Sequence, residues 1–106
     1  MENYKFTDYK FNFDLEKNCK LIDERGINLE DVISTLKAGK VLDVIEHPNK
    51  KRYPQQKIYI IELNNYVLEV PFIRIGSEIF LKTAYPSRKM TNKYLKEKFL
   101  KGESVK

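Results

Sequence analysis

Residues 57–73, KIYIIELNNYVLEVPFI, decide the fold of this chain. The first seven are rich in β-branched and aromatic residues, which are typical of a β-strand. Asn64 and Asn65 follow, and because asparagine tolerates positive φ they favour a two-residue turn. The last eight predict the returning strand of a β-hairpin. Pro71 has no backbone N–H, so we expect a bulge or a local sheet edge there.

Two helical patterns precede the hairpin. Residues 15–25, LEKNCKLIDER, follow Asp14, which is a good N-cap, and end before Gly26, a helix stop. Spacings of four and three place three residues on one apolar face: Leu15, Cys19 and Ile22. This cysteine is expected to be a partly buried thiol. Asn28 begins a second helix with an apolar stripe, and the two helices together predict a helical hairpin.

Strand patterns flank the hairpin on both sides. Residues 41–47, VLDVIEH, carry several β-branched residues, and residues 78–85, EIFLKTAY, follow a turn signal at Gly76. Ser87 can cap a final helix with three residues on one side: Met90, Tyr94 and Leu95. Before the first helix, aromatic residues recur with period two, which indicates a short strand or an extended arm.

This order predicts one α+β domain over residues 1–106, with an N-terminal helical hairpin, a sheet of about four antiparallel strands and a C-terminal helix. Residues 1–12 are expected to form the arm or strand, and residues 102–106 a flexible tail. No apolar run reaches the roughly 20 residues that span a bilayer, and the N-terminus has no apolar signal segment. With one unpaired cysteine, the chain is expected to be cytoplasmic, without a membrane partner.

Charge is divided unevenly along the chain. Residues 1–46 hold seven Lys/Arg and ten Asp/Glu, a net charge of −3. Residues 47–106 hold thirteen Lys/Arg and five Asp/Glu, a net charge of +8. A basic half favours an anionic partner such as nucleic acid, although surface lysines also serve solubility.

The sequence has no motif for nucleotide or metal chemistry. Its four glycines are isolated, so there is no Walker or Rossmann phosphate loop. One histidine and one cysteine cannot build a zinc site, and the basic half lacks a carboxylate cluster for magnesium. We therefore expect no metal and no cofactor, and any catalysis is expected to be metal-independent.

Cations and phenols gather in the loop 47–56 and in the junction 82–89. Metal-free RNA cleavage needs a base for the 2′-hydroxyl, an acid for the leaving 5′-oxygen and positive charge at the phosphate. The catalytic candidates are His47, Lys51, Arg52, Lys82 and Arg88. The RNA-binding candidates in these segments and the following helix are Lys50, Tyr53, Tyr85, Lys89 and Tyr94.

Within this set, Arg52 or Arg88 can hold phosphate bidentately, and His47 or a tyrosine can transfer protons. Each candidate also has a plainer interpretation. The histidine is then a loop residue, the cations are a solvated surface, and Tyr94 packs against the sheet.

Several segments resemble the BrnT family of bacterial toxins. Residues 13–18, FDLEKN, and 25–32, RGINLEDV, are similar to its opening: aromatic-Asp-x-x-Lys-Asn, then a basic residue, glycine and a Glu-Glu/Asp pair. The last strand, the alanine-containing junction and the basic helix with Tyr94 resemble its end. On this resemblance, the family's basic residue at the helix end falls on Arg25, a further RNA-binding candidate, and its strand-end arginine falls on Arg88.

The resemblance implies a RelE-like fold, a metal-independent ribonuclease that arrests translation, and neutralisation by a ribbon-helix-helix antitoxin. Residues 24–26 read Glu-Arg-Gly where the family usually has Lys-His-Gly, and residues 85–86 lengthen the junction. The sequence hypothesis is a type II toxin that cleaves RNA. The alternatives are a non-catalytic nucleic-acid- or partner-binding module, and an accessory domain that binds protein alone.

Overall fold

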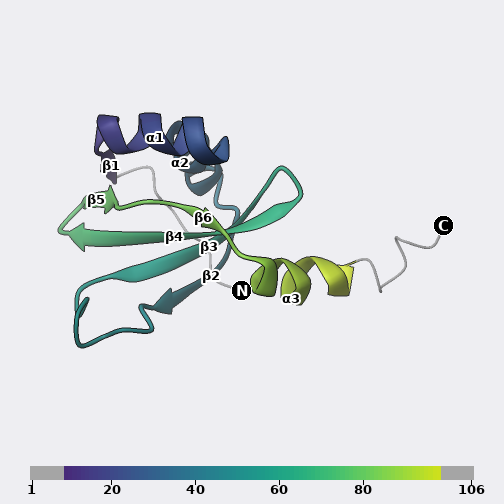
Figure 1. Cartoon of the computed structure of the whole chain (residues 1–106). Coiled ribbons are helices and arrows are strands. Elements are labelled where there is room, and N and C mark those ends of the chain that lie inside the picture. The colour runs from purple at the N-terminus through teal and green to yellow at the C-terminus, as the bar shows by residue number, and fades with distance from the viewer. Residues whose placement is uncertain (1–8, 99–106) are drawn as a thin grey trace.

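One mixed sheet carries helices on both of its faces (Figure 1). The structure is a computed structural model, and it describes residues 9–98 of the chain. In chain order the elements are β1 (Lys10–Phe13), α1 (Leu15–Arg25), α2 (Leu29–Lys37), β2 (Val41–Glu46), β3 (Lys57–Leu63), β4 (Tyr66–Ile75), β5 (Glu78–Leu81), β6 (Tyr85–Pro86) and α3 (Arg88–Lys98). None of these helices combines the length and apolar character needed to cross a membrane. The predicted tail at 102–106 and residues 1–8 of the expected arm lie outside the described part.

The sheet has six strands in the order β1-β5-β4-β3-β2, and β6 pairs with β4 beyond the end of β5. The four strands from β2 to β5 are antiparallel neighbours. The α+β class is confirmed, but the prediction of about four antiparallel strands is wrong, since β1 adds a parallel pairing with β5. The expected strand at 78–85 breaks into β5 and β6, which adds the sixth strand.

The hairpin of β3 and β4 forms as predicted. Asn64 and Asn65 have φ of 55° and 64° and make the turn between them. Pro71 stays in register with β3, so no bulge forms on that side. Its carbonyl accepts the Lys82 N–H just beyond β5. In an antiparallel strand the backbone N and C=O of one residue point towards the same neighbouring strand. The Pro71 nitrogen, which carries no hydrogen, therefore points to the break between β5 and β6, where no strand needs its N–H. This confirms the local edge.

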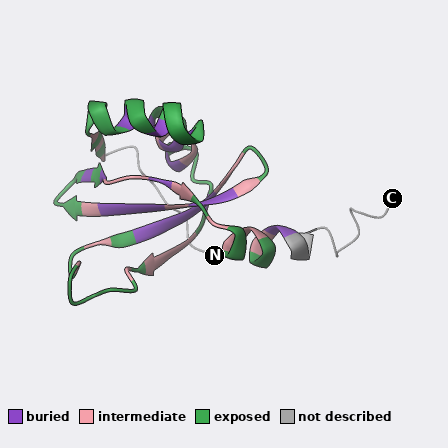
Figure 2. Ribbon diagram, in the orientation of Figure 1, coloured by how far each residue is buried: buried purple, intermediate pink, exposed green. Residues whose placement is uncertain are grey.

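The larger core lies between the sheet and the helical hairpin of α1 and α2 (Figures 1 and 2). The side chains there that are 0% exposed include Leu29, Val32 and Leu36 from α2 and Ile61 and Val70 from the sheet. Burying each such side chain stabilises the fold by about 1.5–3 kcal/mol. The apolar stripe of α2 therefore faces the sheet, as its spacing predicts.

The apolar face predicted for α1 is not the buried one. Leu15 is 73% exposed and Ile22 is 45% exposed. Cys19 is exposed as well, so the expectation of a partly buried thiol is wrong. The residues of α1 that face the core are Asn18 and Leu21, and Figure 2 shows the outer side of α1 as exposed.

A polar contact decides which face of α1 turns inward. Asn18 Oδ1 accepts the Leu29 N–H at 2.7 Å, and Asn18 Nδ2 donates to Asn28 Oδ1 at 3.1 Å. The first N–H of α2 has no partner within its own helix, and here it is buried. Because a buried N–H needs an acceptor, Asn18 is held between the two helices in place of an apolar residue.

α3 packs on the opposite face of the sheet, where it contacts the beginning of β4. Ser87 caps it as predicted, with Oγ accepting the Met90 N–H at 3.1 Å. Leu95 is buried, and Met90 and Tyr94 pack beside it, as the helical spacing predicts. The strand residues that meet them are Ile45, Ile58, Ile60 and Val67.

Candidate functional site

Part of the sheet beside α3 forms a surface that we call the open sheet face. Side chains alternate between the two faces along a strand. Val67 of β4 packs on α3, whereas Ile79 and Leu81 of β5 point into the core on the hairpin side. The open sheet face therefore consists of Glu69, Ile73, Ile75, Glu78, Phe80, Lys82 and Tyr85, and Pro71 on the same side is buried.

Two side-chain contacts organise the open sheet face. Lys82 Nζ lies 5.3 Å from the centroid of the Phe80 ring. Tyr85 Oη donates to Glu69 Oε1 at 3.1 Å. Burial, followed by the charge and the hydrogen bond of Glu69, raises the pKa of Tyr85 to about 12. This phenol therefore stays protonated and donates near neutral pH.

The start of α3 brings further cations beside this face. Arg88 and Lys89 are exposed in its first turn. Ser87 fixes that turn, because its N–H donates to a β4 carbonyl at 2.9 Å. Tyr94 turns towards β2, where its Oη donates to Asp43 Oδ2 at 3.3 Å. Burial and then the Asp43 charge raise the pKa of Tyr94, so this phenol also acts as a donor.

The loop 47–56 is folded around Asn49. Its Oδ1 accepts the Arg52 N–H at 3.2 Å, and its own N–H donates to His47 Nδ1 at 3.0 Å. The His47 and Tyr53 rings lie 4.6 Å apart, and the Arg52 guanidinium carbon is 5.5 Å from the Tyr53 centroid. Because Nδ1 is an acceptor, the neutral His47 ring carries its proton on Nε2.

Two lysines of the same loop are solvent-exposed. Lys50 Nζ pairs with Glu46 Oε1 at 2.5 Å, and this hydrogen bond and charge lower the pKa of Glu46. Lys51 is exposed beside it. Exposed ion pairs contribute little to stability, so both lysines are available to an anionic ligand.

The loop and the junction share one side of the sheet without meeting at one point. The His47 N–H donates to Gln56 O, which extends the ladder of β2 and β3 by one residue. Alternation then places His47 on the same side as Ile45 and the open sheet face. Three strand spacings, roughly 14 Å, separate β2 from β5. His47 and Lys82 are therefore placed to contact different parts of an extended ligand.

Arg25 lies on the other side of the sheet. Its Nη1 donates to the Ala84 carbonyl at 3.1 Å, and Ala84 belongs to the core beneath the helical hairpin. The guanidinium therefore supports the junction from behind, and it is separated by the sheet from Lys82 and Tyr85.

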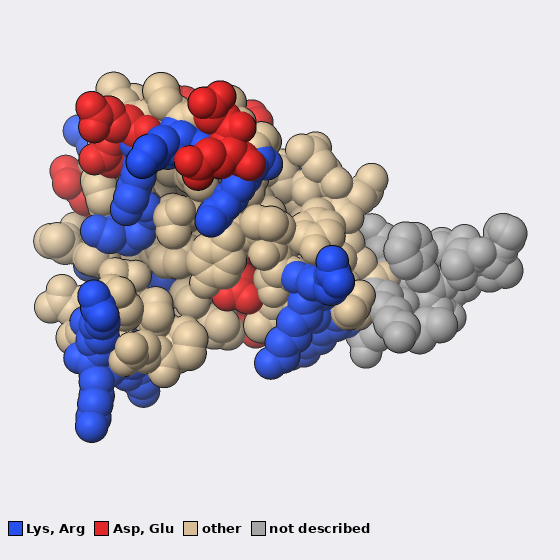
Figure 3. Space-filling view, in the orientation of Figure 1, with Lys and Arg blue, Asp and Glu red and all other residues tan. Residues whose placement is uncertain are grey.

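Charge on this side forms two basic groups with acid between them. Figure 3 shows Lys and Arg atoms over the loop that joins β2 and β3 and over α3, with acidic atoms in between. The carboxylates that strand alternation and contacts place on this side are Asp43, Glu62, Glu69 and Glu78, and two of them accept tyrosine hydroxyls. Separated cationic groups of this kind suit a ligand that is extended and anionic.

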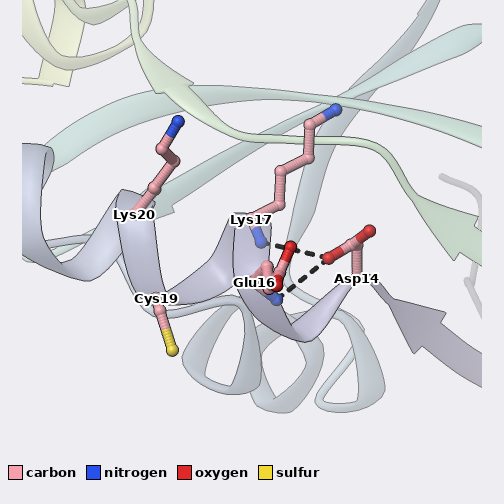
Figure 4. A pocket seen from close by; sticks show the side chains of 5 residues that line it. All are labelled: Asp14, Glu16, Lys17, Cys19 and Lys20. Atoms are coloured by element: carbon pink, nitrogen blue, oxygen red, sulfur yellow. Dashed lines mark hydrogen bonds between the residues drawn. The ribbon is translucent and has the colours of Figure 1, made fainter.

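Two depressions lie away from the open sheet face. One of about 420 Å³ runs along α1, where Cys19 points to the opposite side from Lys17 and Lys20 (Figure 4). The other, of about 220 Å³, lies between the helical hairpin turn and the β3–β4 turn, with Arg25 and Asp31 in its wall. Within residues 9–98, no three His, Cys, Asp or Glu side chains are grouped to hold a metal ion.

The charged and aromatic residues of this region that were absent from the predicted site are Asp43, Glu62, Glu69, Glu78 and Phe80. Alternation could have placed Phe80 beside Lys82, since they are two residues apart in one segment. No local signal joins Glu69 to Tyr85 or Asp43 to Tyr94, because those partners are 16 and 51 residues apart.

Comparison of the chain with protein-family models, with curated proteins and with solved structures gives no match. The strongest element of the site's geometry is the open sheet face with its flanking cations.

Proposed function

We propose that this chain is a divergent BrnT-like toxin with a RelE-like fold, which binds RNA on the open sheet face and cleaves it without a metal ion. The observation that carries the proposal is the exposed sheet face with Lys82 on it and Arg88 and Lys89 beside it. The resemblance of residues 13–18 and 25–32 to the family supports it. A ribbon-helix-helix antitoxin and a cytoplasmic location belong to the same proposal.

The proposed reaction is an internal transesterification of RNA. The 2′-oxygen attacks the adjacent phosphorus, the bond from phosphorus to the 5′-oxygen breaks, and the products are a 2′,3′-cyclic phosphate and a 5′-hydroxyl. A base takes the 2′-hydroxyl proton and an acid returns one to the 5′-oxygen. Lys82 and Arg88 balance the charge that develops on the phosphate. Glu69 is a carboxylate on the same face that can accept the first proton.

The test is incubation of purified protein with RNA in EDTA, followed by analysis of the fragment ends. We expect fragments with cyclic-phosphate ends, and a loss of roughly 100-fold in cleavage rate for the Lys82→Ala, Arg88→Ala double variant. The matched control removes two exposed cations outside the proposed site, in Lys20→Ala, Lys40→Ala, and should cleave like the wild type. Intact RNA, or full cleavage by the first double variant, contradicts the proposal.

A second candidate, a non-catalytic RNA-binding module, is favoured by a separate observation. The groups that could move protons are already engaged: His47 Nδ1 accepts from Asn49, Tyr85 donates to Glu69, and the third, Tyr94, donates to a β2 carboxylate. This candidate predicts salt-dependent RNA binding with no fragments. The same incubation in EDTA separates the two functions.

A further inference from the structure

Phe80 is an aromatic side chain exposed on a strand inside the sheet. β5 lies between β1 and β4, where Phe80 pairs with Asn12 and Ile73. Even so, the residue is 38% exposed, because it points away from the hairpin-side core and lies outside the cluster that packs on α3. Its ring is therefore part of the surface that we propose binds RNA.

A cation lies beside this ring. Lys82 is two residues further along the chain on the same face, with Nζ 5.3 Å from the ring centroid. An aromatic ring next to an ammonium group matches the two parts of a nucleotide, since a base stacks on the ring and the phosphate pairs with the cation. The arrangement places both contacts within one nucleotide's reach.

We propose that Phe80 is a stacking platform for an unpaired base, so that the RNA taken by this protein is single-stranded. This inference rests on the proposed function and names its substrate class. In a duplex, both faces of each base are stacked on neighbouring base pairs, so no base face is free to stack on the Phe80 ring. A single strand offers splayed bases and a flexible backbone, which can follow the sheet from Phe80 towards the start of α3.

The surroundings favour RNA over a protein partner on this ring. Lysine is depleted in the cores of protein–protein interfaces, whereas it is enriched where phosphate is bound. Here the lysine lies over the aromatic ring, and the cations Arg88 and Lys89 are exposed further along the sheet, in the first turn of α3. The acid on the same face of β5 is Glu78, two residues before the ring and on the side away from Lys82.

The experiment uses a short RNA that carries 2-aminopurine, either alone or paired with its complement. We expect the wild type to bind the single strand at least 10-fold more tightly than the duplex and to quench the fluorescence on binding. Phe80→Leu, which keeps an apolar side chain, should bind the single strand roughly 5- to 100-fold more weakly and lose the quenching. Phe80→Trp should restore both, and Leu15→Ala, an exposed apolar change on α1 outside the open sheet face, should leave both unchanged.

The outcomes separate this inference from the proposed function. RNA cleavage that depends on Lys82 and Arg88, together with unchanged binding and quenching in Phe80→Leu, overturns the stacking inference alone. A wild type that prefers the duplex overturns it as well. A wild type that binds no RNA removes the proposed function and this inference together. Thermal unfolding of Phe80→Leu at the wild-type temperature establishes that a loss of binding comes from the ring.

Discussion

Asn18 shows how one side chain fixes the junction of two helices. It is 7% exposed, and its amide accepts the Leu29 N–H and donates to Asn28 Oδ1. An apolar residue at this position would bury as well but would leave that N–H without an acceptor. The polar side chain is therefore part of the core, and it orients α1.

We expect Asn18→Ala to lower the free energy of unfolding by roughly 1–3 kcal/mol, because a buried N–H loses its partner. Urea denaturation measures this change. Asn12→Ala, at an exposed position of β1, is the control and should shift the value by less than about 0.5 kcal/mol. Equal midpoints for the two variants would show that the helical hairpin does not depend on the Asn18 amide.

Tyr85 gives a prediction for alkaline pH. Its pKa in the folded protein, about 12, is above the ordinary value of 10.0. The neutral phenol therefore contributes stability that is complete below about pH 10 and is lost as the pH rises through 12. Allowing for solvent screening at this partly exposed group, we expect Tyr85→Phe to remove on the order of 1 kcal/mol of that pH dependence. Urea denaturation of both proteins across this range measures the difference.

The partner of Tyr85 supplies a second check on the cause of its pKa. Burial is the first cause and the Glu69 carboxylate the second. Glu69→Gln removes the charge and keeps the burial, so the pKa of Tyr85 should fall only part of the way to 10.0. Titration of the ultraviolet absorbance of tyrosinate measures the pKa of Tyr85. The part of the signal that is lost in Tyr85→Phe belongs to this residue. A full return to the ordinary value would make the carboxylate the main cause.

At the scale of elements, the first turn of α3 attaches this helix to the sheet. Ser87 caps it through the Met90 N–H, and Thr91 Oγ1 both donates to Ser87 O at 2.7 Å and accepts the Val67 N–H at 3.0 Å. The helix is therefore tied to β4 through the backbone as well as through its apolar side. This attachment sets the position of Arg88, the first residue of α3, relative to the sheet.

We expect Ser87→Ala to lower the free energy of unfolding by about 1 kcal/mol through loss of the N-cap. Ser34→Ala is the matched control, because Ser34 is an exposed residue inside α2 whose hydroxyl donates to a carbonyl of its own helix. Alanine is the better helix former at that interior position, so this variant should be neutral or slightly more stable. Urea denaturation measures both free energies of unfolding. Equal values for Ser87→Ala and Ser34→Ala would show that the Ser87 cap does not stabilise α3.

The lengthened junction has a structural explanation at the scale of elements. Residues 85–86, which depart from the BrnT pattern, form β6 and pair with β4 beside Pro71. Arg25 holds the Ala84 carbonyl from the hairpin side, and Tyr85 holds Glu69 on the other. The two extra residues therefore extend the sheet before α3 begins, so the first turn of that helix lies beside the open sheet face.

At the scale of the whole molecule, the uneven charge of the sequence becomes two basic groups on one side of the sheet (Figure 3). Binding of single-stranded RNA there should release counterions, so the logarithm of the affinity should fall linearly with the logarithm of salt concentration. Removing one phosphate contact in Lys82→Ala should reduce the steepness of that line by about 0.7. Lys40→Ala, an exposed cation outside the proposed site, should leave the slope unchanged.

Fluorescence anisotropy at several salt concentrations measures both slopes. A Lys82→Ala line parallel to that of the wild type would mean that Lys82 makes no phosphate contact. Equal losses in the Lys82 and Lys40 variants would instead point to attraction by net charge, without a defined site.

Much of the local structure follows from the sequence. Strand periodicity gives β3 and β4, asparagine gives the turn between them, and the spacing of apolar residues gives the buried stripe of α2. The same spacing rule predicts the wrong buried face for α1, because it considers only the apolar residues Leu15, Cys19 and Ile22. It takes no account of Asn18, a polar residue that is buried because it accepts the Leu29 N–H. The cationic candidates are also visible in the sequence, since charge is a property of each residue.

The sequence by itself determined the α+β class, the bounds of α1 and β3, the turn at Asn64 and Asn65, and the concentration of cations in the second half of the chain. These depend on backbone preferences and on periodicity within a few residues. The tertiary structure alone decided the parallel pairing of β1 with β5, the inward face of α1, and the meeting of Phe80, Lys82, Glu69 and Tyr85 on one exposed face. The pairings that join separate elements are set by burial and by hydrogen-bond partners far away in the chain, which no local pattern records.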